Sequence, residues 1–144
     1  MPEGWRPSSP PVSAADLSAV LTGNPVVIIH FWAAWNGADR LFDPKRANVR
    51  AEFEGRIEFR SADVDDPDLV SFCRECEVVN VPALGCFVDG ERVKTIIGAI
   101  PEDNLRAEFR SLLPGSANDE PQAAADYESG GAVRPNRQWW QFWK

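Results

Sequence analysis

The sequence contains little of what most catalytic and metal sites are made from: three cysteines and one histidine in 144 residues. Three cysteines are too few for a disulfide scaffold, and their odd number leaves at least one thiol unpaired. They also fall short of the four ligands of a structural zinc site, so we expect neither a metal nor another cofactor. Because His30 is the only histidine, no His–His or His–acid catalytic motif is apparent.

Long apolar runs are also absent. The longest apolar run, Val26 to Trp32, is far shorter than the 18 or so residues of a membrane span. The first seven residues lack the basic and apolar regions of a signal peptide, which predicts a cytoplasmic protein. The net charge of −7 argues against nucleic acid as a partner, since binding to a duplex depends on cations that neutralise phosphates.

Composition divides the chain into four segments. Residues 1–11 contain four prolines and are predicted to form a flexible arm. Residues 12–113 have the apolar patterning of one domain, which is enough chain to bury a core. Residues 114–137 have the small, polar and acidic composition of a flexible linker, and residues 138–144 form an aromatic motif.

Within the domain, periodicity and turn signals predict alternating helices and strands. The expected elements are a helix capped by Ser13 and stopped at Gly23-Asn24-Pro25, helices near 38–54, 67–73 and 101–113, and strands near 26–32, 57–64, 83–88 and 92–97. The first strand is apolar throughout, which indicates that both of its faces are covered, and the strand after it is expected to run parallel. In the helix at 38–54, Leu41, Val49 and Phe53 are expected to point inward. The order specifies an α/β fold with a central mixed sheet flanked by helices on both faces.

Several local motifs in this order resemble the thioredoxin family, and together they cover about 100 residues. The matching segments are Phe31–Asp39, Pro44, Asp63–Asp66, Val81-Pro82, Asp89-Gly90 and Gly98-Ala99. The resemblance implies the thioredoxin fold and a cis peptide bond between Val81 and Pro82.

The chain departs from the family at the redox motif. Asn36-Gly37-Ala38-Asp39 stands where the family has Cys-Gly-Pro-Cys, and an amide and a carboxylate cannot form a mixed disulfide. Both residues suit the start of a helix instead: Asn36 is a good N-cap, and Asp39 places an acid near the positive end of the helix dipole. We therefore assign no catalytic residue to these positions and expect no enzyme built on them.

His30 is the second departure. The resemblance places a buried aspartate at this position, where it exchanges protons with the second cysteine of the motif. We expect His30 to be buried and neutral, with its pKa lowered by desolvation among apolar neighbours. A role as a ligand or a base is the alternative.

A different Cys-x-x-Cys pair, Cys73 and Cys76, falls late in its predicted helix. The i, i+3 spacing permits a disulfide, but the negative end of the helix dipole and the neighbouring acids Glu75 and Glu77 oppose thiolate formation. Structural thiols, a regulatory or exchangeable disulfide, and a metal site all remain open for this pair.

The motif at 138–144 is unusual because it holds four large aromatic residues within five positions: Trp139, Trp140, Phe142 and Trp143. Burying each of these side chains would stabilise the docked segment by roughly 1.5–3 kcal/mol, before the entropy cost of ordering the segment is subtracted. Three docking places are open: a groove of the same domain, a partner protein, or a membrane surface.

These features favour a redox-inactive adaptor that binds a protein or peptide. In the family, the groove beside the cis-proline holds a substrate segment through the backbone of the preceding residue. The resemblance therefore implies a groove lined by Trp35, Val81, Pro82 and Ala99. The alternatives are a thiol–disulfide oxidoreductase or redox sensor that uses Cys73 and Cys76, and a peripheral membrane tether that uses the aromatic motif.

Overall fold

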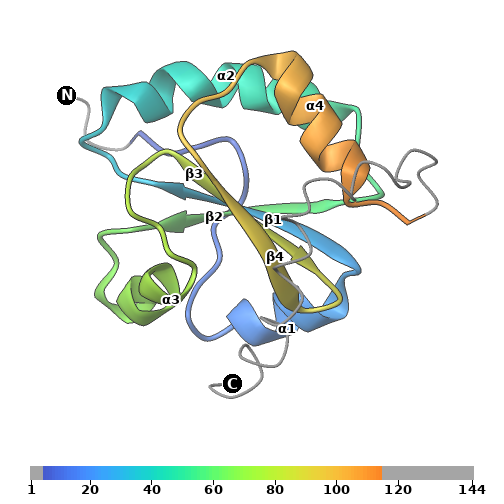
Figure 1. Ribbon diagram of the computed structural model, residues 1–144. Helices are drawn as coiled ribbons and strands as arrows, with labels where there is room; N and C mark the ends of the chain where they lie inside the picture. Colours follow the sequence, from blue (N-terminus) through green and yellow to red (C-terminus); the bar gives the residue numbers. More distant parts are fainter. Residues whose placement is uncertain (1–4, 115–144) are drawn as a thin grey trace.

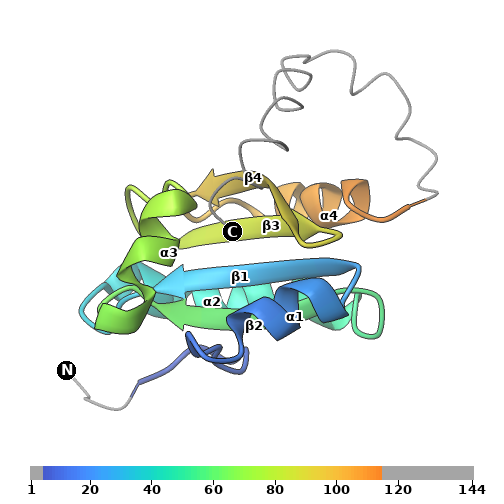
Figure 2. The same ribbon diagram turned by 90° about the horizontal axis from the view of Figure 1, so that it is seen from below.

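A computed structural model describes residues 5–114 and forms three layers around a four-stranded sheet (Figures 1 and 2). The elements in chain order are α1 (Leu17–Gly23), β1 (Val26–Trp32), α2 (Gly37–Ala51), β2 (Glu58–Asp63), the 3-10 turn η1 (Pro67–Leu69), α3 (Val70–Glu75), β3 (Ala83–Val88), β4 (Glu91–Ile97) and α4 (Glu102–Ser111). None of the helices in residues 5–114 is long and apolar enough to cross a membrane. Nearly all of the linker 114–137 and all of the aromatic motif 138–144 lie outside the described residues.

The sheet has the strand order β2-β1-β3-β4. Strand β1 pairs in parallel with β2 and antiparallel with β3, and β3 pairs antiparallel with β4. The β3–β4 hairpin turns at Asp89 and Gly90, which both have positive φ, as a type I′ turn requires. The predicted mixed sheet, the parallel pair and the hairpin are confirmed.

Strand β1 lies between two cores because its side chains alternate between the faces of the sheet. Val27, Ile29 and Phe31 pack on the face covered by α1 and α3. Val26 and Ile28 pack on the other face, against α2 and α4. Every residue of β1 is buried, which confirms the prediction from its unbroken apolar run.

Helix α2 buries Val49 as predicted, but the prediction is wrong for Leu41. Phe42 and Arg46 are buried beside Val49, whereas Leu41 is 75% exposed. The helix also ends at Ala51, so Phe53 reaches the core from the turn that follows. Counting apolar residues misjudged the inward face because two polar residues of this helix, Asp39 and Arg46, occupy it.

The predicted flexible arm is bound to the domain over its described part, residues 5–11. Ser9 is buried, and backbone hydrogen bonds join Pro10 O to Ser61 N–H (2.8 Å) and Val12 N–H to Ser61 O (2.9 Å). The ring of Trp5 meets the edge of Trp32, with 5.5 Å between the centroids. The edge of β2 binds this segment through the backbone of Ser61.

Gly85 in β3 is required by close packing. A Cβ atom at this position would lie 3.0 Å from a ring carbon of Phe31 and 3.2 Å from one of Phe87. Gly85→Ala is therefore expected to lower the free energy of unfolding by about 1–3 kcal/mol, the usual cost of overpacking a core. Denaturant unfolding measures the change, and Gly37→Ala is the matched control, since nothing lies within 4 Å of its Cβ. An equal loss in both variants would contradict the packing argument.

Candidate functional site

Asn36 connects the start of α2 to the loop before Pro82. Its Oδ1 accepts hydrogen bonds from the N–H groups of Ala38 (2.8 Å) and Asp39 (3.3 Å), so the predicted N-cap is confirmed. The amide nitrogen of the same side chain donates to the carbonyl oxygen of Val81 at 3.0 Å. Asn36 therefore holds two segments together at a position where the thioredoxin motif would place a reactive thiol.

The backbone of Val81 is occupied within the chain. The Val81-Pro82 peptide bond is cis, as predicted. However, the Val81 N–H donates to Asn80 Oδ1 at 2.9 Å, and the Val81 carbonyl accepts from Asn36. Both backbone groups that were expected to pair with a bound peptide therefore have one partner within the chain, and the carbonyl oxygen keeps a second lone pair.

Asp39 and His30 form a fully buried pair that sequence reasoning missed. Asp39 Oδ1 lies 3.1 Å from His30 Nε2, and neither side chain is exposed. Because a carboxylate only accepts hydrogen bonds, His30 carries a proton on Nε2 and donates it. Asp39 Oδ2 accepts from the Ala33 N–H at 3.1 Å. Asp39 thus joins α2 to the end of β1 and does more than complement the helix dipole.

A signal for this pair was present in the sequence. The resemblance pairs position 30 with position 39 in the family, as an aspartate next to a cysteine. In this chain the acid is Asp39 and its partner is His30. The acid has moved from one position to the other, and a hydrogen bond still joins the two side chains. Neither difference alone indicates the contact, whereas the two together do.

Burial lowers the pKa of His30, and the hydrogen bond with Asp39 only partly opposes this. The predicted direction is therefore confirmed. Asp43, one helical turn from Asp39, has a lowered pKa because the hydrogen bond and charge of Arg46 outweigh the effect of burial. The Arg46 side chain is fully buried and also donates to Ser9 Oγ at 3.0 Å.

Cys73 and Cys76 lie at the end of α3, where the helix closes in a Schellman motif. Glu77 has a φ of 61°, its N–H bonds to Arg74 O (3.0 Å), and the Val78 N–H bonds to Cys73 O (3.1 Å). Burial raises the pKa of Cys73 to about 11 and that of Cys76 to about 12. Asp63 and Asp66 raise the Cys73 value further through their charge. Among the described residues, both thiols are free.

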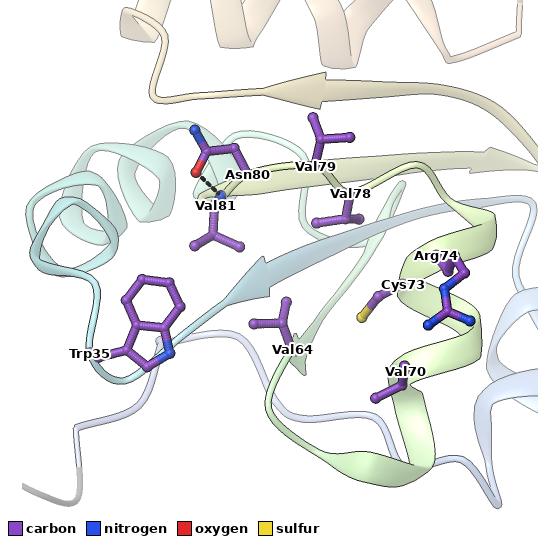
Figure 3. Close-up of a pocket in the computed structure, with 9 residues that line it drawn as sticks. All are labelled: Trp35, Val64, Val70, Cys73, Arg74, Val78, Val79, Asn80 and Val81. Carbon is purple, nitrogen blue, oxygen red and sulfur yellow. Dashed lines mark hydrogen bonds between the residues drawn. The ribbon is translucent and has the colours of Figure 1, made fainter.

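A cavity of about 370 Å³ lies between α3, the loop before Pro82 and the start of α2. It is lined mainly by valines, together with Trp35, Cys73, Arg74 and Asn80. The Cys73 sulfur points into it, between Val64 and Val78 (Figure 3). We call this space the Cys73 cavity.

The predicted groove residues divide between the cavity and the neighbouring strand end. Trp35 and Val81 line the Cys73 cavity, and Pro82 is buried. Ala99 is exposed and follows Gly98, whose N–H donates to the Pro82 carbonyl at 2.8 Å. No group of three His, Cys, Asp or Glu residues suited to a metal ion occurs within residues 5–114.

Comparison with known proteins gives one consistent family. The family model described as Thioredoxin matches residues 12–111. A thioredoxin from Pyropia yezoensis is 34% identical over 94 residues, which are 65% of this chain and 86% of that protein. The chloroplastic thioredoxin M2 of Arabidopsis thaliana is 32% identical over 98 residues, or 67% of this chain. This chain spans about half of that relative, since the match covers 51% of its length.

Solved structures show the same fold. Mitochondrial thioredoxin 3 from Saccharomyces cerevisiae superposes with a TM-score of 0.64 at 23% identity, over 72% of this chain and 94% of that one. A mutant thioredoxin from Halobacterium salinarum superposes with a TM-score of 0.62 at 27% identity, over 76% and 96%. The fold predicted from the sequence is confirmed.

These matches contradict the prediction of a redox-inactive adaptor. The relatives are named thioredoxins, and this chain keeps two cysteines three residues apart, one of them facing the cavity. The general expectation that the chain has a protein partner agrees with the match to the Thioredoxin family model.

Protonation of His30 is expected to destabilise the fold. Because the pKa of His30 is lowered in the folded state, the unfolded chain binds the proton first as the pH falls. Stability should therefore be intact above the unfolded value of about 6.5 and decline as the pH falls from there to the folded pKa. The chain has one histidine, so an NMR titration reports this pKa without ambiguity. A measured pKa above 6.5 would refute the expectation.

Replacing Asp39 by alanine should destabilise the fold more than replacing it by asparagine. Asp39→Ala leaves the His30 Nε2–H and the Ala33 N–H buried without this acceptor, and is expected to lower the free energy of unfolding by about 2–4 kcal/mol. Asp39→Asn keeps one acceptor oxygen and should cost clearly less. Chemical denaturation of the two variants tests this order. Equal losses would show that the carboxylate does not organise the pair.

Proposed function

Because this chain belongs to the thioredoxin family, we propose that it is a thiol–disulfide redox protein whose working pair is Cys73 and Cys76. The observation that carries the proposal is the position of the Cys73 sulfur, which faces a cavity open to a partner. Cys76 follows three residues later, and the i, i+3 spacing at the end of a helix brings two Cα atoms within disulfide range.

The reaction is an exchange of two electrons with a protein disulfide. The Cys73 thiolate attacks one sulfur of the substrate disulfide, which forms a mixed disulfide and releases the other sulfur as a thiolate. The Cys76 thiolate then attacks the Cys73 sulfur, so that a Cys73–Cys76 disulfide forms and the second substrate sulfur leaves. The substrate gains two electrons and two protons, and the pair loses them; the reverse sequence oxidises a substrate dithiol.

The environment of the pair favours slow exchange. With a pKa raised to about 11, Cys73 is a thiolate in only about one molecule in ten thousand at pH 7. A rapid general reductase needs a much larger thiolate fraction. The raised pKa therefore argues against a rapid general reductase and for a pair that equilibrates slowly with the surrounding thiol–disulfide balance. In the reducing cytoplasm, which we propose as the compartment, the pair would rest as two thiols.

Asn36 and Asp39 support this assignment because they cannot take part in thiol–disulfide exchange. Neither side chain can form a sulfur–sulfur bond, and both are engaged in hydrogen bonds that hold the start of α2. The exchange chemistry is left to Cys73, on the opposite wall of the Cys73 cavity from Trp35, and to Cys76 at the end of α3. We propose a protein that carries an accessible cysteine or disulfide as the partner.

The redox couple is directly testable. In glutathione buffers of increasing oxidation, the wild-type chain should gain one internal disulfide reversibly, seen as a loss of two alkylation sites by mass spectrometry. Cys73→Ser and Cys76→Ser should each abolish this transition. Cys86→Ser is the matched control, because Cys86 is buried on the other face of the sheet and should leave it unchanged.

Two outcomes would overturn the proposal. One is a wild-type chain that keeps all three thiols at every glutathione ratio. The other is a disulfide that persists in Cys73→Ser, since this would assign the transition to other cysteines.

A further inference from the structure

Exposed apolar side chains gather at the Cys73 cavity. Of the five large hydrophobic residues exposed in the described part of the chain, three line it: Trp35, Val70 and Val79. Trp35 is 67% exposed and Val79 is 82% exposed. Grouped apolar exposure of this kind marks a surface that another segment covers.

An acidic segment lies beside the cavity. Four of the six residues in the segment 63–68 are aspartates, and Val64 within this segment lines the cavity. Asp65 accepts a hydrogen bond from the indole nitrogen of Trp35 at 2.9 Å. Asp63 and Asp66 are close enough to act on the Cys73 thiol through their charge. Arg74 is the only cation among the lining residues.

One segment of this chain has the complementary chemistry. Residues 138–144 contain Trp139, Trp140, Phe142 and Trp143. The surrounding stretch 130–144 carries three cations, Arg134, Arg137 and Lys144, and no acid. Aromatic rings suit the valine-lined wall, and the cations suit the acidic segment 63–68.

The segment can also reach the cavity. Helix α4 lies on the opposite face of the sheet from α3, so the chain must pass around the domain (Figure 1). The 24 residues of 114–137 have a root-mean-square reach of about 25–30 Å. A domain of about 100 residues has a radius of gyration near 13 Å, which makes this distance sufficient. Tethering by such a linker corresponds to millimolar concentrations of the segment.

We propose that residues 138–144 dock in the Cys73 cavity of the same chain, with aromatic rings on Trp35 and Val79 and flanking cations toward the segment 63–68. The docked segment shares the cavity with the Cys73 side chain, so the reactivity of this thiol toward a small alkylating agent reports the docking.

Variants of the full-length chain test the docking, one in the segment 138–144 and one in the lining of the Cys73 cavity. One variant replaces Trp139, Trp140, Phe142 and Trp143 with serine, and its matched control carries Gln138→Ser and Gln141→Ser. On the cavity side, Val79→Glu adds a charge at an exposed position, and Leu41→Glu does the same at an equally exposed position on α2.

The first measurement is NMR of the amide groups and of the Trp35 indole. Signals from residues lining the cavity should shift in the aromatic-to-serine variant and in Val79→Glu. In the two controls they should match the wild type. The second measurement is alkylation of Cys73 by iodoacetamide. Its rate should rise about tenfold on loss of the aromatic rings, as expected if the docked state is about ten times more populated than the open one.

Several outcomes would overturn the docking. Cavity signals that are identical in wild type and the aromatic-to-serine variant would show that the segment does not dock there. Shifts that depend on protein concentration would assign the contact to a second copy, and shifts that need vesicles of anionic phospholipid would assign it to a membrane. The two proposals fail separately: shifted cavity signals without a glutathione couple refute only the function, and a couple with unshifted signals refutes only the docking.

Discussion

The hydrogen bond between His30 and Asp39 determines where helix α2 begins relative to strand β1. Asp39 receives hydrogen bonds from His30 and from the Ala33 backbone, so the first turn of α2 is held at the end of the buried central strand. Asn36 then lies where its side chain caps the helix and binds the carbonyl of Val81. The position of the loop before Pro82, and with it one wall of the Cys73 cavity, follows from a single buried pair.

This arrangement explains how a thioredoxin fold is retained after its usual cysteines are replaced. Burying a carboxylate is costly unless hydrogen-bond donors surround it. His30 and the Ala33 N–H supply these donors to Asp39. Asn36 contributes a cap and a bond to Val81, which a thiol would supply less well. The start of α2 has therefore become a structural junction, and the remaining thiol chemistry is confined to α3.

The two thiols at the end of α3 lie in surroundings that disfavour their charged form. They end a short helix, they are buried, and aspartates face the one that lines the cavity, so their pKa values are raised. The raised pKa values make slow exchange the expectation for the proposed pair. A cavity with apolar walls beside an acidic segment, and an aromatic and cationic segment in the same chain, have the complementary chemistry on which the proposed docking rests.

The sequence by itself determined the architecture, because unbroken apolar runs, the Asp89-Gly90 turn and helix-capping residues act locally and agree with one another. It also determined the cap at Asn36 and the neutral state expected of His30. Tertiary structure alone decided the inward face of α2, where buried Asp39 and Arg46 leave Leu41 in solvent. It likewise decided that both backbone groups of Val81 are occupied and that Cys73 opens to a cavity. These features depend on contacts between segments far apart in the chain, such as Asn36 with Val81, whose geometry no local pattern specifies.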